Sequence, residues 1–439
     1  MKRRHHRKPF ARLEWPGRRT YEPSAANLQI QVEAYPPGVD RTTDFGGQLI
    51  LGDNLTVMAA LLPEWEERID LIYVDPPFLT GKAYAARIGR GEDSRRPSEW
   101  RTVDGYRDTW PNGATYLDML YPRLQLMYQL LAPSGTLYLH LDWHASAYAR
   151  ILLDEIFGPD RFLNEIVWIY HGPSPIRSAF KRKHDTILVY TKSKDYTFNA
   201  DAVRVAYNPS TIKTFDSSPK AGFGKVPDLA RGKVPEDWWY FPVVARMHKE
   251  RSGYPTQKPE ALLERIIKAS SNPGEVVADF FCGSGTTPVV ASRLSRHWLA
   301  CDRSLQAIHT TYRRFMLKKV DKPFTVYKAD EEKNHNSLQP QIVLSQLDAQ
   351  VTIKLEGLQS DNGLPDSFPE NLVLWEVDWN YDGRVFHSRS QSVRPWREDF
   401  IDLQLGHEYD QPGTYTLCIR AIDSQSRSGL TTHNVKVSF

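Results

Sequence analysis

An apolar run that ends in Asp-Pro-Pro-Phe, at residues 71–78, constrains the fold of this chain more than any other stretch. Four apolar residues before a proline pair predict a buried strand that stops at Asp75, because proline has no N–H to donate within a sheet. Pro77 also pushes Pro76 into an extended conformation. The Asp75 carboxylate and the Pro76 carbonyl therefore become hydrogen-bond acceptors at a strand end, beside the ring of Phe78.

Two acceptors beside a flat ring suit a planar base that carries an exocyclic amino group. Phe78 would stack on such a base, while Asp75 and the Pro76 carbonyl would accept its two amino hydrogens. The same residues also fit a strand that ends in an ordinary type I turn, since Asp-Pro pairs often start turns. Taken alone, the stretch leaves both interpretations open.

A glycine-rich turn supplies the second constraint. Residues 276–287 are typical of a strand, a Gly-x-Gly turn and the start of a helix. Pro288 stands where a dinucleotide-binding fingerprint needs its third glycine. A second apolar run ends in Asp302, about 20 residues past the glycines, where a ribose-binding carboxylate belongs. The pattern predicts a nucleoside cofactor without a pyrophosphate.

Together the two motifs resemble the signature of the amino-group DNA methyltransferases, which methylate N6 of adenine or N4 of cytosine with S-adenosylmethionine. Asp-Pro-Pro-Phe precedes Phe-x-Gly-x-Gly here, as in the beta class of that family. The resemblance covers residues 47–318 and includes matching segments at residues 51–55, 135–142, 184–193 and 254–260. Phe280 is a departure, since many members have proline at that position.

The resemblance implies an α/β fold: a Rossmann-like methyltransferase sheet with helices on both faces and a permuted motif order. The catalytic motif that it implies is Asp75, Pro76, Pro77 and Phe78. The cofactor-binding residues that it implies are Asp53, Lys258, Asp279, Phe281, Cys282, Gly283, Gly285, Thr286 and Asp302. Lys258 is expected at the methionine carboxylate, where an ammonium suits the charge. Asp53 either caps a helix or approaches the cofactor adenine.

The implied function is site-specific methylation of a base flipped out of duplex DNA, because a stacked base cannot reach such a cleft. Asp-Pro-Pro-Phe is more typical of adenine enzymes, so we expect N6-adenine, with N4-cytosine as the alternative. A catalytically silent DNA-binding scaffold and a methyltransferase acting on RNA or protein amides are further alternatives. Covalent C5-cytosine chemistry needs a cysteine nucleophile, and neither Cys282 nor Cys301 is placed to act as one.

Composition limits the compartment and the partners. The 439 residues include three scattered cysteines and no CxxC pair, which fits a reducing cytoplasm and predicts no metal site. No apolar run approaches the ~18 residues of a membrane span, and no signal peptide is expected. The net charge of +3 alone implies no polyanion. The expected cofactor is S-adenosylmethionine and the expected partner is double-stranded DNA; a homodimer and a restriction endonuclease are candidate partners.

Changes in composition predict four parts of the chain. Residues 1–46 are rich in arginine, lysine and proline and predict a basic arm, either laid on DNA phosphates or solvated and disordered. Residues 47–328 form the methyltransferase domain, and residues 329–341 form a polar linker. Short alternating runs in residues 342–439 predict an all-β sandwich that resembles PKD-type immunoglobulin-like domains. We expect this sandwich to fold separately.

Several features inside the methyltransferase domain carry predictions of their own. Residues 79–114 predict a long polar loop, and residues 195–250 a target-recognition insert. His140 is a candidate general base, although a hydrogen-bonded strand-end histidine is the favoured interpretation. At least one of Trp238 and Trp239 is expected in the core. The residues expected at DNA phosphates are Arg177, Lys181, Arg182, Lys183 and His184.

Overall fold

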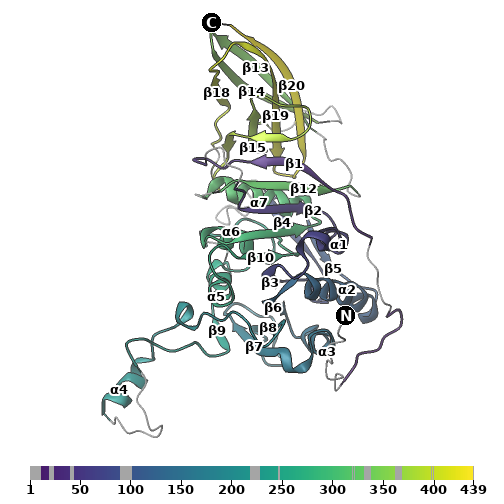
Figure 1. The fold of residues 1–439 in the computed structure, drawn as a ribbon, viewed down its shortest axis with the longest axis vertical. Coiled ribbons are helices and arrows are strands. Elements are labelled where there is room, and N and C mark those ends of the chain that lie inside the picture. Colours follow the sequence, from purple (N-terminus) through teal and green to yellow (C-terminus); the bar gives the residue numbers. More distant parts are fainter. Residues whose placement is uncertain are drawn as a thin grey trace.

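A single eleven-stranded sheet runs through the centre of the molecule (Figure 1). The computed structural model describes residues 11–18, 24–39, 44–88, 101–217, 228–245, 248–318, 320, 322–330, 338–360, 368–396, 398 and 400–438. The strands, in spatial order, are β16 (Phe386–Ser388), β1 (Leu28–Ala34), β12 (Phe324–Ala329), β2 (Gly47–Leu51), β11 (His297–Asp302), β10 (Val276–Asp279), β3 (Ile69–Val74), β6 (Leu131–Leu141), β8 (His184–Thr191), β7 (Phe162–Ile169) and β9 (Trp238–Tyr240).

The middle of this sheet is parallel, from β12 through β2, β11, β10 and β3 to β6. Strand β8 runs antiparallel to β6, and β1 runs antiparallel to β12. Parallel strands are buried on both faces, which explains the unbroken apolar run before Asp75. Leu71 and Tyr73 point to one core, and Ile72 and Val74 point to the other.

Helices cover both faces of the sheet, so the predicted Rossmann-like α/β fold is confirmed. The helices of one face are α1 (Asn54–Trp65), α2 (Gly113–Leu130) and α3 (Ser146–Phe157), and those of the other are α5 (Glu260–Ser270), α6 (Thr286–Arg293) and α7 (Leu305–Leu317). Helix α4 (Pro209–Ser217) lies on an extension away from the sheet (Figure 1). Within the described ranges, none of the helices is long and apolar enough to cross a membrane.

The prediction of a long loop at residues 79–114 is wrong. Strands β4 (Lys82–Ile88) and β5 (Arg101–Asp108) pair as an antiparallel hairpin, whose residues 89–100 lie outside the described ranges. The rings of Tyr84 and Tyr106 stack across the two strands at 4.8 Å. The hairpin forms a two-stranded sheet of its own. Strands are predicted from apolar residues that alternate along one buried face, and this hairpin shows little of that pattern.

The predicted basic arm at residues 1–46 is also wrong in part. Strand β1 is paired within the sheet, and residues 11–18 lie against α2 and α3. The Arg18 side chain is 7% exposed and forms an ion pair with Glu155, while its guanidinium lies over the rings of Trp15 and Tyr121. Arg18 therefore stabilises the fold and is not available to DNA. The remaining predicted arm cations outside the described residues are Lys2, Arg3, Arg4, Arg7, Lys8 and Arg19.

The C-terminal unit, residues 338–438, contains two further sheets. One sheet holds β13 (Leu338–Leu347), β14 (Gln350–Ser360) and β18 (Gln404–Glu408), and the other holds β17 (Ser390–Val393), β15 (Leu372–Asp378), β19 (Gly413–Asp423) and β20 (Ser428–Val437). Apolar residues of both sheets share one core. The first strand begins at Leu338, inside the predicted linker at 329–341, whose residues 331–337 are not described. The likeness to PKD-type domains stays a prediction.

The C-terminal unit is built into the methyltransferase sheet rather than tethered to it (Figure 1). Strand β16 extends the large sheet by pairing in parallel with β1. Leu374, Phe386, Cys418 and Ile422 belong to the same apolar cluster as residues of β1, β12 and α7. The expectation of a separately folding sandwich is therefore not supported.

Polar contacts also cross this junction. Glu376 on β15 is fully buried and accepts a hydrogen bond from the Tyr312 hydroxyl of α7 at 2.9 Å. Arg420 lies 3.2 Å from the same carboxylate. Arg313 donates to the Arg394 carbonyl at 2.9 Å. Removal of the unit would expose the apolar residues of β1, β12 and α7 that pack against it, and exposed apolar surface destabilises the fold and favours aggregation.

We therefore predict that a chain ending at residue 337 aggregates, or melts at a clearly lower temperature than the full chain. Size-exclusion chromatography and thermal melting of both chains would measure this. If the shortened chain were monomeric and melted at the same temperature as the full chain, the methyltransferase domain would fold independently of the C-terminal unit, and the prediction would be wrong.

Candidate active site

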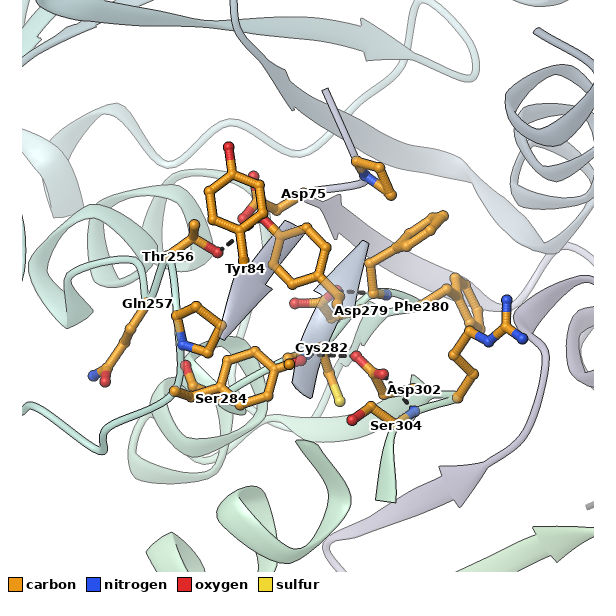
Figure 2. Close-up of a pocket in the computed structure, with 18 of the residues that line it drawn as sticks. Asp75, Tyr84, Thr256, Gln257, Asp279, Phe280, Cys282, Ser284, Asp302 and Ser304 are labelled. Atoms are coloured by element: carbon orange, nitrogen blue, oxygen red, sulfur yellow. Dashed lines mark hydrogen bonds between the residues drawn. The ribbon is translucent and has the colours of Figure 1, made fainter. Parts of the chain in front are cut away.

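Three carboxylates lie at one edge of the sheet, around a cavity of about 590 Å³ (Figure 2). Asp75 follows β3, Asp279 ends β10, and Asp302 ends β11. These strands are neighbours and run parallel, so their carboxyl ends meet at the same edge. Asp75 and Asp279 are more than 200 residues apart in the sequence, and the pairing of β3 with β10 brings them together.

The Gly-x-Gly turn holds the floor of this cavity and fixes Asp302. Gly283 and Gly285 have φ angles of +49° and +73°, which glycine adopts most easily. A Cβ atom on Gly285 would lie 2.4 Å from the Thr311 hydroxyl, so a side chain has no room there. The Gly283 N–H donates to Asp302 at 2.9 Å, and the Ser304 N–H donates to it at 2.8 Å. Burial raises the pKa of the Asp302 carboxyl.

Asp279 is an unusual carboxyl because it is buried and its hydrogen-bond donors in the described part of the chain are uncharged. It accepts from the Phe281 N–H at 3.0 Å and from the Thr287 hydroxyl at 2.5 Å. Burial raises its pKa to about 7, against these two hydrogen bonds. A cationic ligand in the cavity would favour the ionised form of Asp279.

The sequence left open whether Asp53 caps a helix or approaches the cofactor adenine, and the structure shows the helix cap. Its side chain caps α1 by accepting from the Leu55 N–H at 2.9 Å, and it also lines the cavity. Arg123 of α2 donates to Asp53 at 2.6 Å and also bonds Asn54. The sequence does not predict Arg123 as a site residue, because it lies among the apolar residues of a helix and no motif marks it.

A second cavity, of about 580 Å³, meets the first at Asp75. The two cavities share Tyr84, Tyr106, Lys258 and the neighbouring residues 254–257. Lys258 Nζ contacts Asp75 Oδ2. Asp75 Oδ1 is buried and has no hydrogen-bond partner within the described part of the chain. One oxygen of Asp75 is thus anchored by a cation, and the other is a vacant acceptor.

Phe78 and His140 stack beside the second cavity, with ring centroids 5.8 Å apart. His140 is fully buried, and its two ring nitrogens lie 2.8 Å from the Tyr73 hydroxyl and 3.3 Å from Asp185. Burial opposes ionisation of Asp185, but the bond with His140 keeps its pKa below the ordinary value. His140 is therefore a hydrogen-bonded strand histidine that backs the Phe78 ring, as favoured from the sequence.

The rim of the second cavity is aromatic and basic. Trp143 is 50% exposed, and the Arg182 guanidinium lies 4.2 Å from its ring centroid. Tyr170 lines the same cavity. Trp239 is buried and Trp238 is exposed, as expected for at least one core tryptophan.

The predicted site residues distribute between the two cavities. Those that line the first are Asp53, Asp75, Pro77, Lys258, Asp279, Phe281, Cys282, Gly283, Thr286 and Asp302. Those that line the second are Asp75, Pro76, Phe78 and Lys258. Gly285 shapes the turn without lining either cavity. Phe280, the departure noted in the motif, is buried in the core. Burial raises the pKa of the Cys282 thiol, which makes it a poor nucleophile.

A family model described as DNA methylase matches residues 69–313, more than half of the chain. The chain belongs to the DNA methylase family. It is 32% identical over 269 residues to the type II methyltransferase M.HpaI of Haemophilus parainfluenzae, covering 61% of this chain and 73% of the relative. It is 29% identical over 286 residues to the DNA adenine methyltransferase YhdJ of Escherichia coli, covering 64% and 85%.

A weaker likeness connects this DNA methylase to a solved structure. The cytosine-N4-specific PvuII DNA methyltransferase is 16% identical, covers 66% of this chain and 91% of its own, and has a TM-score of 0.43.

An ion network around the buried Glu260 lies next to the Gly-x-Gly turn of the first cavity. Glu260, at the start of α5, pairs with Arg293 at 2.6 Å, with Arg314 at 2.8 Å, and with Lys318. Arg314 also donates to the Ser284 carbonyl in the Gly-x-Gly turn at 2.9 Å. Burial opposes ionisation of Glu260, but Lys318 and the neighbouring arginines lower its pKa to about 2. The network ties α5, α7 and the turn together.

We predict that Glu260→Gln lowers the free energy of unfolding by about 3 kcal/mol at pH 7, since the pKa falls from 4.5 to about 2 on folding. A lowered folded pKa means that this stabilisation is present above pH 4.5 and is lost as the pH falls towards 2. Urea unfolding at pH 7, 4 and 3 (about these values) would show the gap between variant and wild type narrowing.

Glu264→Gln is the matched control, because Glu264 lies on the same helix and pairs with Lys268 and Arg293 near the surface. Its loss should cost below about 1 kcal/mol. Equal effects of the two substitutions would contradict the role of the Glu260 network.

Proposed function

We propose that this methylase transfers a methyl group from S-adenosylmethionine to the N6 amino group of an adenine flipped out of duplex DNA. The observation that carries the proposal is that Asp75 lines both cavities, while its buried Oδ1 has no hydrogen-bond partner among the described residues. A cofactor in one cavity and a base in the other would face each other across this carboxylate. The methyl group would then pass directly between them, with no covalent enzyme intermediate.

The first cavity fits the cofactor. S-adenosylmethionine, when bound, supplies an electrophilic methyl group on a positively charged sulfur. Asp302 would accept from the ribose hydroxyls, because a carboxylate has about four acceptor sites and its two backbone bonds occupy only part of them. Asp279 faces the cavity as a carboxyl with a pKa of about 7, which a nearby positive charge would keep ionised. Gly283 lets the backbone come close to the ligand.

Lys258, which the family resemblance assigns to the methionine carboxylate of the cofactor, also pairs with Asp75. Its contact with Asp75 Oδ2 holds the carboxylate in place and compensates its charge. It also lines the first cavity, so the methionine carboxylate could share the ammonium, which has three donors.

The second cavity fits the base. Asp75 Oδ1 and the Pro76 carbonyl would accept the two amino hydrogens, and this pull frees the nitrogen lone pair that is otherwise delocalised into the ring. Both acceptors would stabilise the positive charge that develops on nitrogen. Asp75 Oδ1 would then take the proton that the methylated nitrogen loses. Phe78, backed by His140, supplies a stacking surface.

DNA would lie over the aromatic and basic rim of the second cavity. Trp143, with Arg182 over its ring, could stack on a DNA base or occupy the position that the flipped base leaves. The exposed cations of residues 177–184 could bind DNA phosphates. Residues 195–250, which carry the extension with α4, are proposed to read the target sequence.

Adenine is preferred over cytosine because Asp-Pro-Pro-Phe is more typical of adenine enzymes and because the relative YhdJ is named as an adenine methyltransferase. N4-cytosine methylation is the second candidate. The relative M.HpaI is a type II methyltransferase, which supports a place in a restriction-modification system, with a homodimer or a cognate endonuclease as partner. Since the substrate is cellular DNA, we place the enzyme in the cytoplasm.

We predict that the purified chain incorporates labelled methyl groups into duplex DNA, and that digestion and mass spectrometry identify N6-methyladenine. Asp75→Ala should lower methyl transfer by at least about 100-fold, as expected for loss of a transition-state hydrogen bond. Calorimetry should show the cofactor affinity within about threefold of wild type, because Asp75 is proposed to bond the base and not the cofactor. N4-methylcytosine as the sole product would overturn the target assignment, and an active Asp75→Ala would overturn the catalytic one.

Asp302→Ala should weaken the binding of S-adenosylmethionine by about 1.5–3 kcal/mol, the range for a lost hydrogen bond to a charged group. This corresponds to a rise in Kd of about 10- to 150-fold. Calorimetry on protein with an unchanged melting temperature is the measurement. The ribose role would be refuted by an unchanged Kd.

A further inference from the structure

The backbone that follows Asp-Pro-Pro-Phe turns around one buried carboxylate. Asp108, the last residue of β5, is 1% exposed. It accepts from the N–H groups of three consecutive residues: Phe78 at 3.0 Å, Leu79 at 2.9 Å and Thr80 at 2.9 Å. Consecutive N–H groups that converge in this way form an anion-binding nest. Here the protein fills the nest with its own side chain.

Further bonds make Asp108 the centre of this turn. The Thr80 hydroxyl donates to it at 2.7 Å, and the Trp110 indole N–H donates at 2.9 Å. Leu79 has a φ of +68°, a conformation that costs free energy in a residue with a side chain. Such a conformation persists where the surroundings determine it, and the bonds of Asp108 do so here.

The turn held by Asp108 carries groups assigned to the base. The Phe78 ring stands on the first bonded residue, and the Pro77 carbonyl next to it accepts from the Tyr116 hydroxyl at 2.8 Å. The segment between Asp75 and Thr80 is therefore fixed on both sides. Since neither Pro76 nor Pro77 has an N–H, the first backbone donor that can anchor the motif is Phe78.

Asp108 also connects this turn to the β4–β5 hairpin. The stacked Tyr84 and Tyr106 of the hairpin line both cavities, and the Tyr106 hydroxyl lies 3.2 Å from that of Thr256. The Gly81 N–H at the hairpin entrance donates to the Asp108 carbonyl at 2.9 Å. Asp108 thus connects the β4–β5 hairpin, which lines both cavities, to the Asp-Pro-Pro-Phe motif.

We propose that Asp108 is a positioning residue for methyl transfer: it sets where the Pro76 carbonyl and the Phe78 ring lie relative to Asp75. This inference depends on the proposed function. Asp108 lines the second cavity, but its carboxylate bonds go to residues 78–80 and to Trp110, so it is proposed to act through the turn. A misplacement of about 1 Å in an active site can lower the rate ~100-fold, so loss of this anchor should act on kcat more than on binding.

The test variant is Asp108→Asn, which keeps the shape of the side chain but replaces one acceptor oxygen with a donor facing the N–H groups. We expect kcat on duplex DNA to fall about 30- to 100-fold, while the Kd for S-adenosylmethionine stays within about threefold. Amide hydrogen exchange at residues 78–80 should become at least about tenfold faster, with exchange in β3 and β6 unchanged. The exchange measurement does not depend on activity.

Asp423→Asn is the matched control. Asp423 is also 1% exposed and accepts from the backbone N–H groups of Gln425 at 2.9 Å and Arg427 at 2.8 Å, but it lies in the C-terminal unit. We expect it to lower the melting temperature without changing kcat. If Asp108→Asn does not fold, Thr80→Val and Trp110→Phe each remove one bond to Asp108 and should lower kcat several-fold.

Three outcomes would overturn the proposal: an unchanged kcat in folded Asp108→Asn, a parallel loss of kcat and cofactor affinity, or unchanged exchange at residues 78–80. If wild-type protein transfers no methyl group to DNA, the proposed function fails instead. The exchange result would still report whether Asp108 holds the turn.

Discussion

The site depends on burying several carboxylates at one edge of a parallel sheet. Their desolvation must be offset, and the structure does this in different ways at each position. Asp302 accepts two backbone N–H groups, Asp279 accepts one N–H and one hydroxyl, and Asp75 is paired with Lys258 through one oxygen only. The incomplete pairing of Asp75 leaves a buried acceptor without a partner, among the described residues, on a residue that lines both cavities. A buried acceptor left open in a native interior calls for a physical explanation, and a bound ligand is one.

The surrounding structure keeps these charges in position. The Glu260 network holds the Gly-x-Gly turn from behind, through Arg314. His140 supports the Phe78 ring, and Asp108 supports the Phe78 backbone. Each supporting group is itself buried and hydrogen-bonded, so the catalytic motif gains rigidity from a layer of polar contacts rather than from apolar packing alone.

The C-terminal unit adds a second kind of support. Strand β16 covers β1, which would otherwise be an open edge of the large sheet, and edge strands left open are sites of aggregation. Glu376 and Phe386 extend the core behind α7, the helix that carries Tyr312 and Arg314. A continuous path of packed residues therefore joins this unit to the Gly-x-Gly turn at the first cavity. We regard the unit as part of the enzyme's core structure.

The amino-acid sequence by itself determined the parallel α/β core, the order of its motifs and the strand-end acids, because buried parallel strands require unbroken apolar runs and tight turns require glycine and proline. It also identified some of the residues that line the two cavities, such as Asp75, Lys258 and Asp302, but not Tyr84, Tyr106 or Arg123. Only the tertiary structure revealed the β4–β5 hairpin, the buried Arg18, the junction with residues 338–438 and the anchoring role of Asp108. Each of these depends on partners far away in the chain, and the identity of a charged residue does not say whether its partner will be water, DNA or a buried side chain.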